Sequence, residues 1–159
     1  DSSGRLRVWD LRSARPQSVE DGSGRTGAGV ACSRFGAADL SLLILGMDGV
    51  LSEWDLRMPD ERKLCVDLSD HCSAEAASDP AVAAPGAPCH CFSLNSPGTH
   101  LAATSCGASA PVVRLADGAV LGLLEGHSDR VTAVAWSPAA DRVLTGSRDR
   151  SLCTHKVVA

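Results

Sequence analysis

The sequence has 159 residues, of which 44% are hydrophobic, and a formal net charge of −4. This length and composition indicate one ordinary folded domain with a buried core, and they exclude a compositionally disordered chain. The negative charge disfavours nucleic acid as the main partner, because a phosphate backbone needs a concentrated Lys and Arg face. No run of 18 apolar residues and no basic-then-apolar leader is present, so we expect no membrane partner.

Two segments in the first half of the chain each end in Trp-Asp-Leu-Arg. The first has a Ser3-Gly4 turn and an apolar run from Leu6 to Leu11 that contains Trp9. The second predicts strands at residues 30–35, 42–45 and 51–56, with the turn Met47-Asp48-Gly49 before the last strand. Trp54 follows Trp9 by 45 residues (54 − 9), a spacing that indicates a repeated structural unit.

The second half of the chain predicts two further copies of this unit. The expected strands of the third copy are 89–94, 101–105 and 111–115. The fourth copy starts at the Gly126-His127 turn and predicts strands at 131–136, at 143–147 and from 151 onward. Short strands bounded by Gly, Asp, Ser and Pro, without sustained helical spacing, predict an all-β fold of antiparallel meanders.

Two low-complexity stretches interrupt the copies. Residues Arg12 to Gly29 and Asp70 to Ala87 are rich in Ala, Gly, Ser and Pro. Each is longer than the loops usual in compact domains, so we expect both to be mobile insertions.

The spacing of about 40–45 residues, the Gly126-His127 pair and the recurring Trp-Asp pair resemble the WD-repeat family of β-propellers. The resemblance implies a partial propeller of four-stranded antiparallel blades. It divides the chain into the end of blade one (1–20), blade two (29–69), a flexible insertion (70–87), blade three (88–125) and an incomplete blade four (126–159). Because a closed propeller has 4–8 blades, we expect the C-terminal part of a larger propeller, and self-association is the alternative. The first residue is Asp, so we interpret position 1 as a processed end or a cut.

The family stabilises each blade by a hydrogen-bonded His, Ser or Thr, Asp and Trp. By resemblance, the structural residues of copy four are His127, Ser147 and Asp149, with His155 at the tryptophan position. Copy two keeps Asp48 and Trp54, and copy one keeps Trp9. No copy has the complete set, so we expect apolar burial to contribute more than these hydrogen bonds.

Family partners often dock on the face that carries the loops before the first strand and between the second and third. By resemblance, the residues on that face are Arg130, Thr132 and Arg148 in copy four and Met47 in copy two. Arginine is enriched in interface hot spots, so the two arginines indicate an acidic peptide or surface as partner. The alternative is that these are ordinary exposed side chains.

Arginines after Trp-Asp have a second interpretation. In some WD-repeat proteins, Trp-Asp-x-Arg marks substrate receptors of cullin-type ubiquitin ligases, in which the arginine helps to dock a propeller-shaped adaptor. Arg57 fits this pattern fully, with Asp48, Trp54 and Asp55, and Arg12 fits it in part. An exposed arginine at a blade edge is the alternative.

The cysteines indicate a reducing compartment, the cytosol or the nucleus. Seven cysteines leave at least one unpaired, and most lie in apolar runs where a free thiol packs as a small hydrophobe. The pairs His71-Cys72 and Cys89-His90-Cys91 offer zinc donors but lack Cys-x2–4-Cys spacing, so we predict no metal and no cofactor.

An enzyme is the remaining alternative, and it has little support. No nucleophile elbow is present, and an active site would need histidines such as His100, His127 and His155 to converge in a cleft. The basic residues near the C-terminus are interrupted by Asp141 and Asp149 and do not predict nucleic-acid binding; they are Arg142, Arg148, Arg150 and Lys156. We therefore predict a non-catalytic protein-interaction scaffold.

Overall fold

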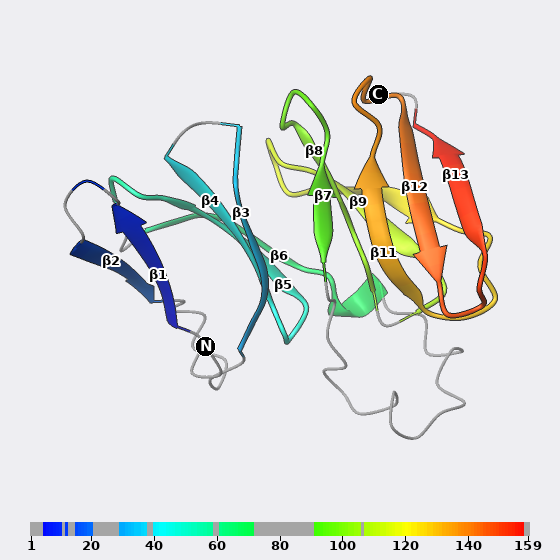
Figure 1. Ribbon diagram of the computed structural model, residues 1–159, viewed down its shortest axis with the longest axis horizontal. Coiled ribbons are helices and arrows are strands. Elements are labelled where there is room, and N and C mark those ends of the chain that lie inside the picture. The colour runs from blue at the N-terminus through cyan, green and yellow to red at the C-terminus, as the bar shows by residue number, and fades with distance from the viewer. Residues whose placement is uncertain are drawn as a thin grey trace.

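The computed structural model describes residues 5–10, 12, 15–20, 29–37, 40–58, 61–71, 91–105 and 107–157. These ranges contain thirteen strands and one short 3-10 helix, η1 (Ser69–His71). Every strand pairing is antiparallel, and the predicted all-β fold is confirmed (Figure 1). In the described part of the chain, no helix has the length and apolar character needed to cross a membrane.

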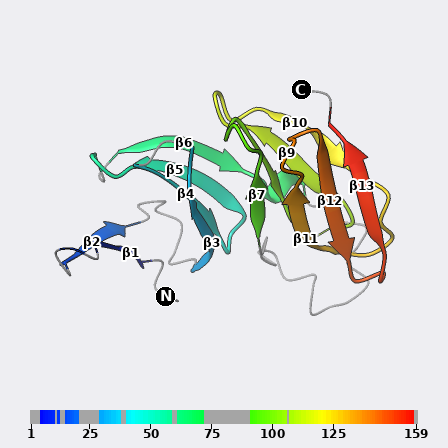
Figure 2. The same ribbon diagram turned by 45° about the horizontal axis from the view of Figure 1, so that its top comes forward.

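The strands form four sheets that lie side by side in chain order (Figures 1 and 2). The first sheet pairs β1 (Arg5–Asp10) with β2 (Arg15–Glu20). The second sheet contains β3 (Val30–Phe35), β4 (Ser41–Gly46), β5 (Val50–Asp55) and β6 (Arg62–Asp67). The third contains β7 (Phe92–Leu94), β8 (His100–Ala103), β9 (Ala110–Arg114) and β10 (Val120–Leu124). The fourth contains β11 (Val131–Trp136), β12 (Arg142–Ser147) and β13 (Leu152–Lys156).

Part of the first expected insertion is a strand. Residues 15–20 form β2, which pairs along its whole length with β1, from Asp10 opposite Arg15 to Arg5 opposite Glu20. The edge of β1 provides backbone partners that outweigh the weak strand preference of this polar segment. Residues 13–14 and 21–28 of that stretch lie outside the described residues, as do residues 72–87 of the second stretch. Only Asp70 and His71 of the second stretch are described, in η1.

The composition of β4 follows from its position between two neighbouring sheets. All six of its residues are buried. Leu42 and Ile44 pack in one cluster with Val8 of the first sheet, whereas Leu43 and Leu45 pack in another cluster toward the third sheet. Because successive side chains of a strand point to opposite faces, a strand buried on both faces reads as a continuous apolar run.

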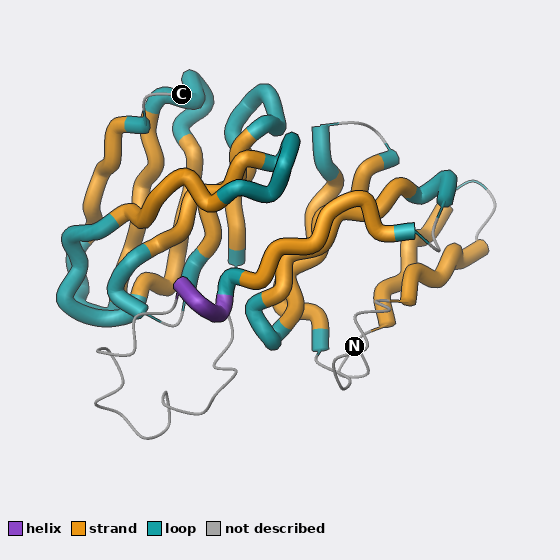
Figure 3. The backbone as a smooth tube through the Cα atoms, turned by 180° about the vertical axis from the view of Figure 1, so that it is seen from behind, coloured by secondary structure: helices purple, strands orange, loops and turns teal. Residues whose placement is uncertain are grey.

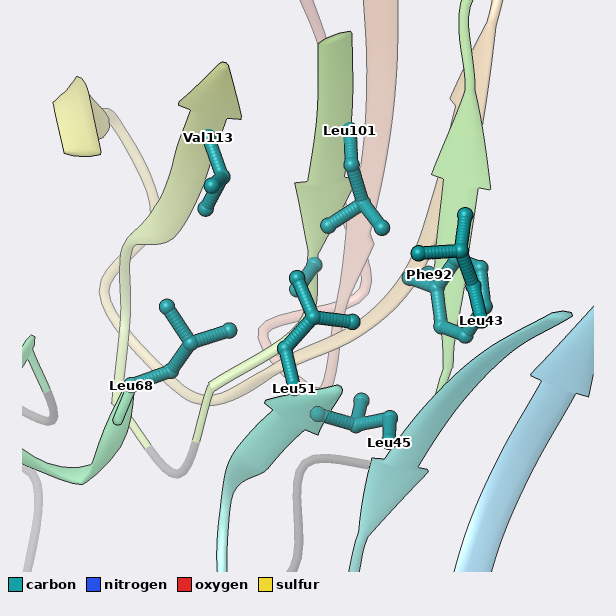
Figure 4. Packing of buried hydrophobic residues seen from close by; sticks show 8 residues of the cluster. Leu43, Leu45, Leu51, Leu68, Phe92, Leu101 and Val113 are labelled. Carbon is teal, nitrogen blue, oxygen red and sulfur yellow. The ribbon is translucent and has the colours of Figure 1, made fainter. Parts of the chain in front are cut away.

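A single apolar cluster joins the second and third sheets (Figure 4). Its fully buried members are Leu43, Leu45, Leu51 and Leu68 from the second-sheet side and Phe92, Leu101, Ala103 and Val113 from the third sheet. Burial of each such leucine or phenylalanine contributes about 1.5–3 kcal/mol relative to exposure. This layer therefore fixes the two sheets against each other.

The fourth sheet is buried on one face only. Its β12 alternates between buried Val143 and Thr145 and the exposed Leu144. Val143 packs with Ala102 and Val112 of the third sheet. This period-2 pattern is the expected one for a strand covered on one side, and no described residue covers the other face.

The two tryptophans of the repeated motif differ in burial. Trp54 is 3% exposed, and its indole N–H donates to Ser52 Oγ at 3.1 Å. Trp9 is 56% exposed, which differs from the expected structural role. Because Val8 packs against the cluster around Trp54, strand alternation turns Trp9 away from the second sheet, toward a side that no described residue covers.

Candidate protein-binding surfaces

Antiparallel strands place alternate turns on opposite faces of the row of sheets. We call these the lower face and the upper face, as they lie in Figure 1. The lower face carries residues 46–50, 104–105, 107–109, 125–130 and 148–151. The upper face carries residues 12, 36–37, 40, 56–58, 61, 95–99, 115–119 and 137–141. Figure 3 shows η1 at the lower edge between the second and third sheets.

The fourth sheet brings two of the predicted binding residues together on the lower face. Arg148 N donates to Arg130 O at 3.0 Å, so the two backbones are joined where β11 begins and β12 ends. Arg148 is exposed and Arg130 is half-buried. Exposed Thr132 follows on β11 and donates to Gly146 O at 3.3 Å.

Met47 does not join this group. It is exposed in the β4–β5 turn of the second sheet, and the third sheet lies between that turn and the fourth sheet. The neighbouring Asp48 caps the turn, because its Oδ1 accepts a hydrogen bond from Val50 N at 3.1 Å. Gly49 completes the turn with a φ of 83°, a conformation that favours glycine.

A chain of hydrogen bonds crosses the fourth sheet. His127 Nδ1 lies 2.9 Å from Asp149 Oδ2, and His127 Nε2 lies 2.9 Å from Thr145 Oγ1. Thr145 Oγ1 in turn lies 2.8 Å from His155 Nε2. The His127 side chain is fully buried, which places this group inside the sheet packing.

The hydroxyl in this chain is that of Thr145 and not, as expected, that of Ser147. Ser147 Oγ instead donates to Asp129 O at 2.8 Å and accepts from Asp149 N at 3.1 Å. The two hydroxyls lie on one face of β12, since they are two residues apart. Strand pairing decides between them, because Thr145 lies opposite Cys153 and thus diagonal to His155.

The geometry assigns the protons. Asp149 accepts hydrogen bonds from the Ser151 hydroxyl at 2.6 Å, from Ser151 N at 2.8 Å and from Ser128 N at 3.0 Å, and these donors hold its pKa well below the ordinary value of 3.8. The anionic carboxylate therefore accepts a hydrogen bond from the Nδ1–H of His127, and His127 Nε2 accepts one from the Thr145 hydroxyl. Thr145 Oγ1 in turn accepts a hydrogen bond from His155 Nε2–H.

His155 thus supplies the N–H donor that an indole supplies in the family pattern, but an imidazole can titrate. Burial, followed by the proximity of His127, lowers the pKa of His155 below its ordinary value of 6.5. A neutral His155 with Nε2 protonated satisfies Thr145. The arrangement is a structural hydrogen-bond network that favours a neutral imidazole.

Of the three histidines that an active site would have to bring together, His100 lies apart from His127 and His155. His127 and His155 share the fourth sheet, whereas His100 begins β8 of the third sheet and has its Nδ1 2.9 Å from Thr99 Oγ1. Among the described residues, no group of three or more His, Cys, Asp or Glu side chains could hold a metal ion. Cys72, Cys89 and His90 lie outside those residues.

Arg12 and Arg57 lie on the upper face, each in the turn that follows its Trp-Asp strand. Both are exposed, and they belong to the adjacent first and second sheets. Arg57 N donates to Asp55 Oδ1 at 2.9 Å, so the aspartate of the motif orders this turn. The two arginines therefore face solvent on the same side of the molecule.

A cavity of about 520 Å³ opens on the upper face between the second and third sheets. Its lining includes Leu43 and Leu115, together with the carboxylate-bearing Glu53 of β5. No sequence pattern predicted this cavity. One sequence feature could have indicated it: Glu53 is a charged residue on the same strand face as apolar Leu51, which lies two residues earlier.

Comparison with known proteins agrees with this architecture. Residues 118–154 match the family model "WD domain, G-beta repeat", which spans β10, β11, β12 and the first residues of β13. The solved structure "Crystal Structure of Mitotic Checkpoint Complex" contains a chain of similar fold, with a TM-score of 0.71 and 17% identity. The match covers 98% of this chain and 43% of that one, so this chain spans less than half of that chain's length. No curated protein sequence matches the chain.

Four-stranded antiparallel meanders packed face to face define the β-propeller class of repeat proteins. Within that class, residues 118–154 match a WD repeat, and the four sheets have the fold of a partial propeller.

Proposed function

We propose that this chain is a non-catalytic scaffold that binds an acidic segment of a partner protein on its lower face. The observation that carries the proposal is the juxtaposition of Arg130 and Arg148 on the fourth sheet, joined by the 3.0 Å backbone hydrogen bond. A WD repeat spans this region, and repeat folds of this kind present loops on rigid stacked sheets. Because such loops are ordered before binding, little conformational entropy is lost on association.

Arg148→Glu tests this proposal, since Arg148 is exposed and the change should leave the fold intact. The probe is a fluorescein-labelled (Glu-Gly)3 peptide measured by fluorescence anisotropy at low ionic strength, with (Lys-Gly)3 as the reversed-charge peptide. We expect the acidic peptide to bind more tightly than the basic one, and Arg148→Glu to weaken it by about five-fold.

Arg142→Glu is the matched control, because Arg142 is also exposed and belongs to β12 but lies next to the upper-face turn. It should leave binding of the acidic peptide unchanged. Equal binding of the two peptides, or equal losses in the two variants, would refute a lower-face acidic site.

A second candidate function has its own observation. Arg12 and Arg57 are both exposed on the upper face of adjacent sheets, which supports a role as a substrate receptor that docks the adaptor of a cullin-type ubiquitin ligase. Combined Arg12→Glu and Arg57→Glu should abolish retention of the purified adaptor in a pull-down, whereas Arg34→Glu on exposed β3 should not. An adaptor that is never retained, or is retained equally by all variants, would end this idea.

Location in a reducing compartment, the cytosol or the nucleus, is part of the proposal. It is supported by the odd number of cysteines and by the free thiols of Cys32, Cys65, Cys91 and Cys153.

A further inference from the structure

The cavity between the second and third sheets takes no part in the lower-face binding proposed above. Its volume of about 520 Å³ lies within the range of ordinary ligand pockets, roughly 300–1,000 Å³. Leu43 and Leu115 provide apolar walls, and Ala37 and Gly98 bring the two sheets together at one side. A Cβ on Gly98 would lie 2.3 Å from the Ala37 Cβ, so this approach requires glycine, whose φ here is 69°.

One carboxylate, that of Glu53, lines the cavity. Glu53 lies opposite Leu43 on β4 and shares its strand face with Leu51, which places it toward the third sheet. Only 8% of the residue is exposed. Burial of a charged group is unfavourable unless it is well paired, so the partners of this carboxylate decide what the cavity can bind.

The pairing of Glu53 is incomplete. Ser41 Oγ donates to Oε1 at 2.6 Å, and Lys63 Nζ lies 3.5 Å from the same oxygen. Oε2 accepts no hydrogen bond from the described residues. The Lys63 side chain is 68% exposed, and such solvent-exposed pairs contribute little, so this ammonium can be displaced into water.

Two other side chains in the lining, Arg114 and His100, have partners of their own. The Arg114 guanidinium makes three contacts with Asp117, at 2.6, 3.0 and 3.1 Å, which direct its charge toward its own turn. His100 Nδ1 lies 2.9 Å from Thr99 Oγ1. Glu53 is therefore the most buried charged side chain in the lining, and the ligand complementary to it is a cation.

We propose that this cavity binds a basic side chain, preferably arginine, of a peptide segment from a partner protein. The aliphatic stem lies along Leu43 and Leu115, and the cationic head donates to Glu53 in place of Lys63. Lysine and arginine side chains combine an apolar stem with a charged end, which matches apolar walls around a single carboxylate. Arginine is favoured because its planar fork can reach both carboxylate oxygens.

This site rests on the scaffold proposal and deepens it, because it adds an upper-face site for a basic side chain to the lower-face site for an acidic segment.

The probes are fluorescein-labelled pentapeptide pools, randomised except for a central arginine, citrulline or glutamate. They are titrated with the full chain, and binding is measured by fluorescence anisotropy. Citrulline keeps the shape of arginine and removes its charge. We expect the arginine pool to bind about ten-fold more tightly than the citrulline pool, as charge-assisted hydrogen bonds require.

Glu53→Gln keeps the side-chain shape and should remove the preference for arginine over citrulline. Glu61→Gln makes the same chemical change at an exposed upper-face residue outside the lining, and it should keep the preference. Ala116→Trp fills the cavity from an exposed lining position while Glu53 stays in place, so it should abolish binding of both pools even if Glu53→Gln fails to fold.

Equal binding of the arginine and citrulline pools would overturn the proposal, as would an arginine preference that survives Glu53→Gln or Ala116→Trp. Tighter binding of the glutamate pool would assign the cavity to an anion held by Lys63 and would also overturn it. The (Glu-Gly)3 peptide, measured on the same variants, separates the two proposals. If the protein binds the acidic peptide through Arg148 but shows no preference for arginine, the cavity proposal is refuted and the scaffold proposal is retained.

Discussion

Trp54 and Trp9 occupy equivalent positions in two copies of one motif, and their different burial gives a matched pair of variants. Trp54 packs with Leu42, Ile44 and Leu56 and is 3% exposed. Trp54→Ala removes this contact area and the hydrogen bond to Ser52 Oγ, so we expect it to lower the free energy of unfolding by about 3–5 kcal/mol. Trp9→Ala removes a ring that is 56% exposed and should cost less than about 1 kcal/mol.

Urea denaturation monitored by far-UV circular dichroism measures both changes. With a slope of about 2 kcal/mol per molar urea, Trp54→Ala should lower the midpoint by about 1.5–2.5 M, and Trp9→Ala by less than about 0.5 M. Trp54→Phe serves as a control, because it keeps an aromatic ring in the cluster and loses the indole N–H, with an expected cost of about 1–2 kcal/mol. Similar costs for Trp54→Ala and Trp9→Ala would show that the packing against the first sheet does not stabilise the fold in the way described.

Three further predictions concern the fourth sheet and the core. The pKa of His155 is lowered in the folded state, so neutral His155 stabilises the fold fully above pH 6.5, and this contribution to stability is lost as the pH falls below 6.5. The urea midpoint should therefore decrease from pH 7 to pH 5, and His155→Gln should make that decrease smaller. A midpoint independent of pH would contradict this. Thr145→Val should cost about 1–3 kcal/mol, because it leaves Nε2 of buried His127 and Nε2 of partly buried His155 without their common partner. Ser147→Ala should cost less, and equal costs in equilibrium denaturation would reverse the assignment of the hydroxyl. Leu43→Ala should cost about 2–5 kcal/mol, whereas Leu144→Ala, at an exposed position, should cost under about 1 kcal/mol, and thermal melting of both variants checks the difference.

Local patterns in the sequence account for most of the strands. The predicted strand at 30–35 is β3, and the predicted turn at Met47-Asp48-Gly49 joins β4 to β5. These features depend on side-chain alternation and on glycine in turns, which neighbouring residues determine. β2 was missed because its residues have weak strand preference, and its strand conformation depends on pairing with β1.

The details of the candidate sites were less accessible from sequence. The family resemblance placed His127 and Asp149 in one hydrogen-bonded set, as observed, but it assigned the hydroxyl to Ser147 where the structure has Thr145; both hydroxyls lie on one face of β12. The cavity around Glu53 requires two separate sheets, one within residues 30–67 and the other within residues 92–124, to meet face to face. No local pattern specifies the space that remains between their side chains.

By itself, the sequence determined the all-β class, the repeated unit and the turns, because alternation and turn chemistry act over a few residues. Only the tertiary structure decided that Trp54 is buried while Trp9 is exposed, that His155 reaches Thr145, and that a carboxylate lines a cavity between sheets. Each of these depends on which sheet packs against which face. Such packing follows from contacts between residues far apart in the chain, and the pattern of a single strand does not specify which sheet packs against which of its faces.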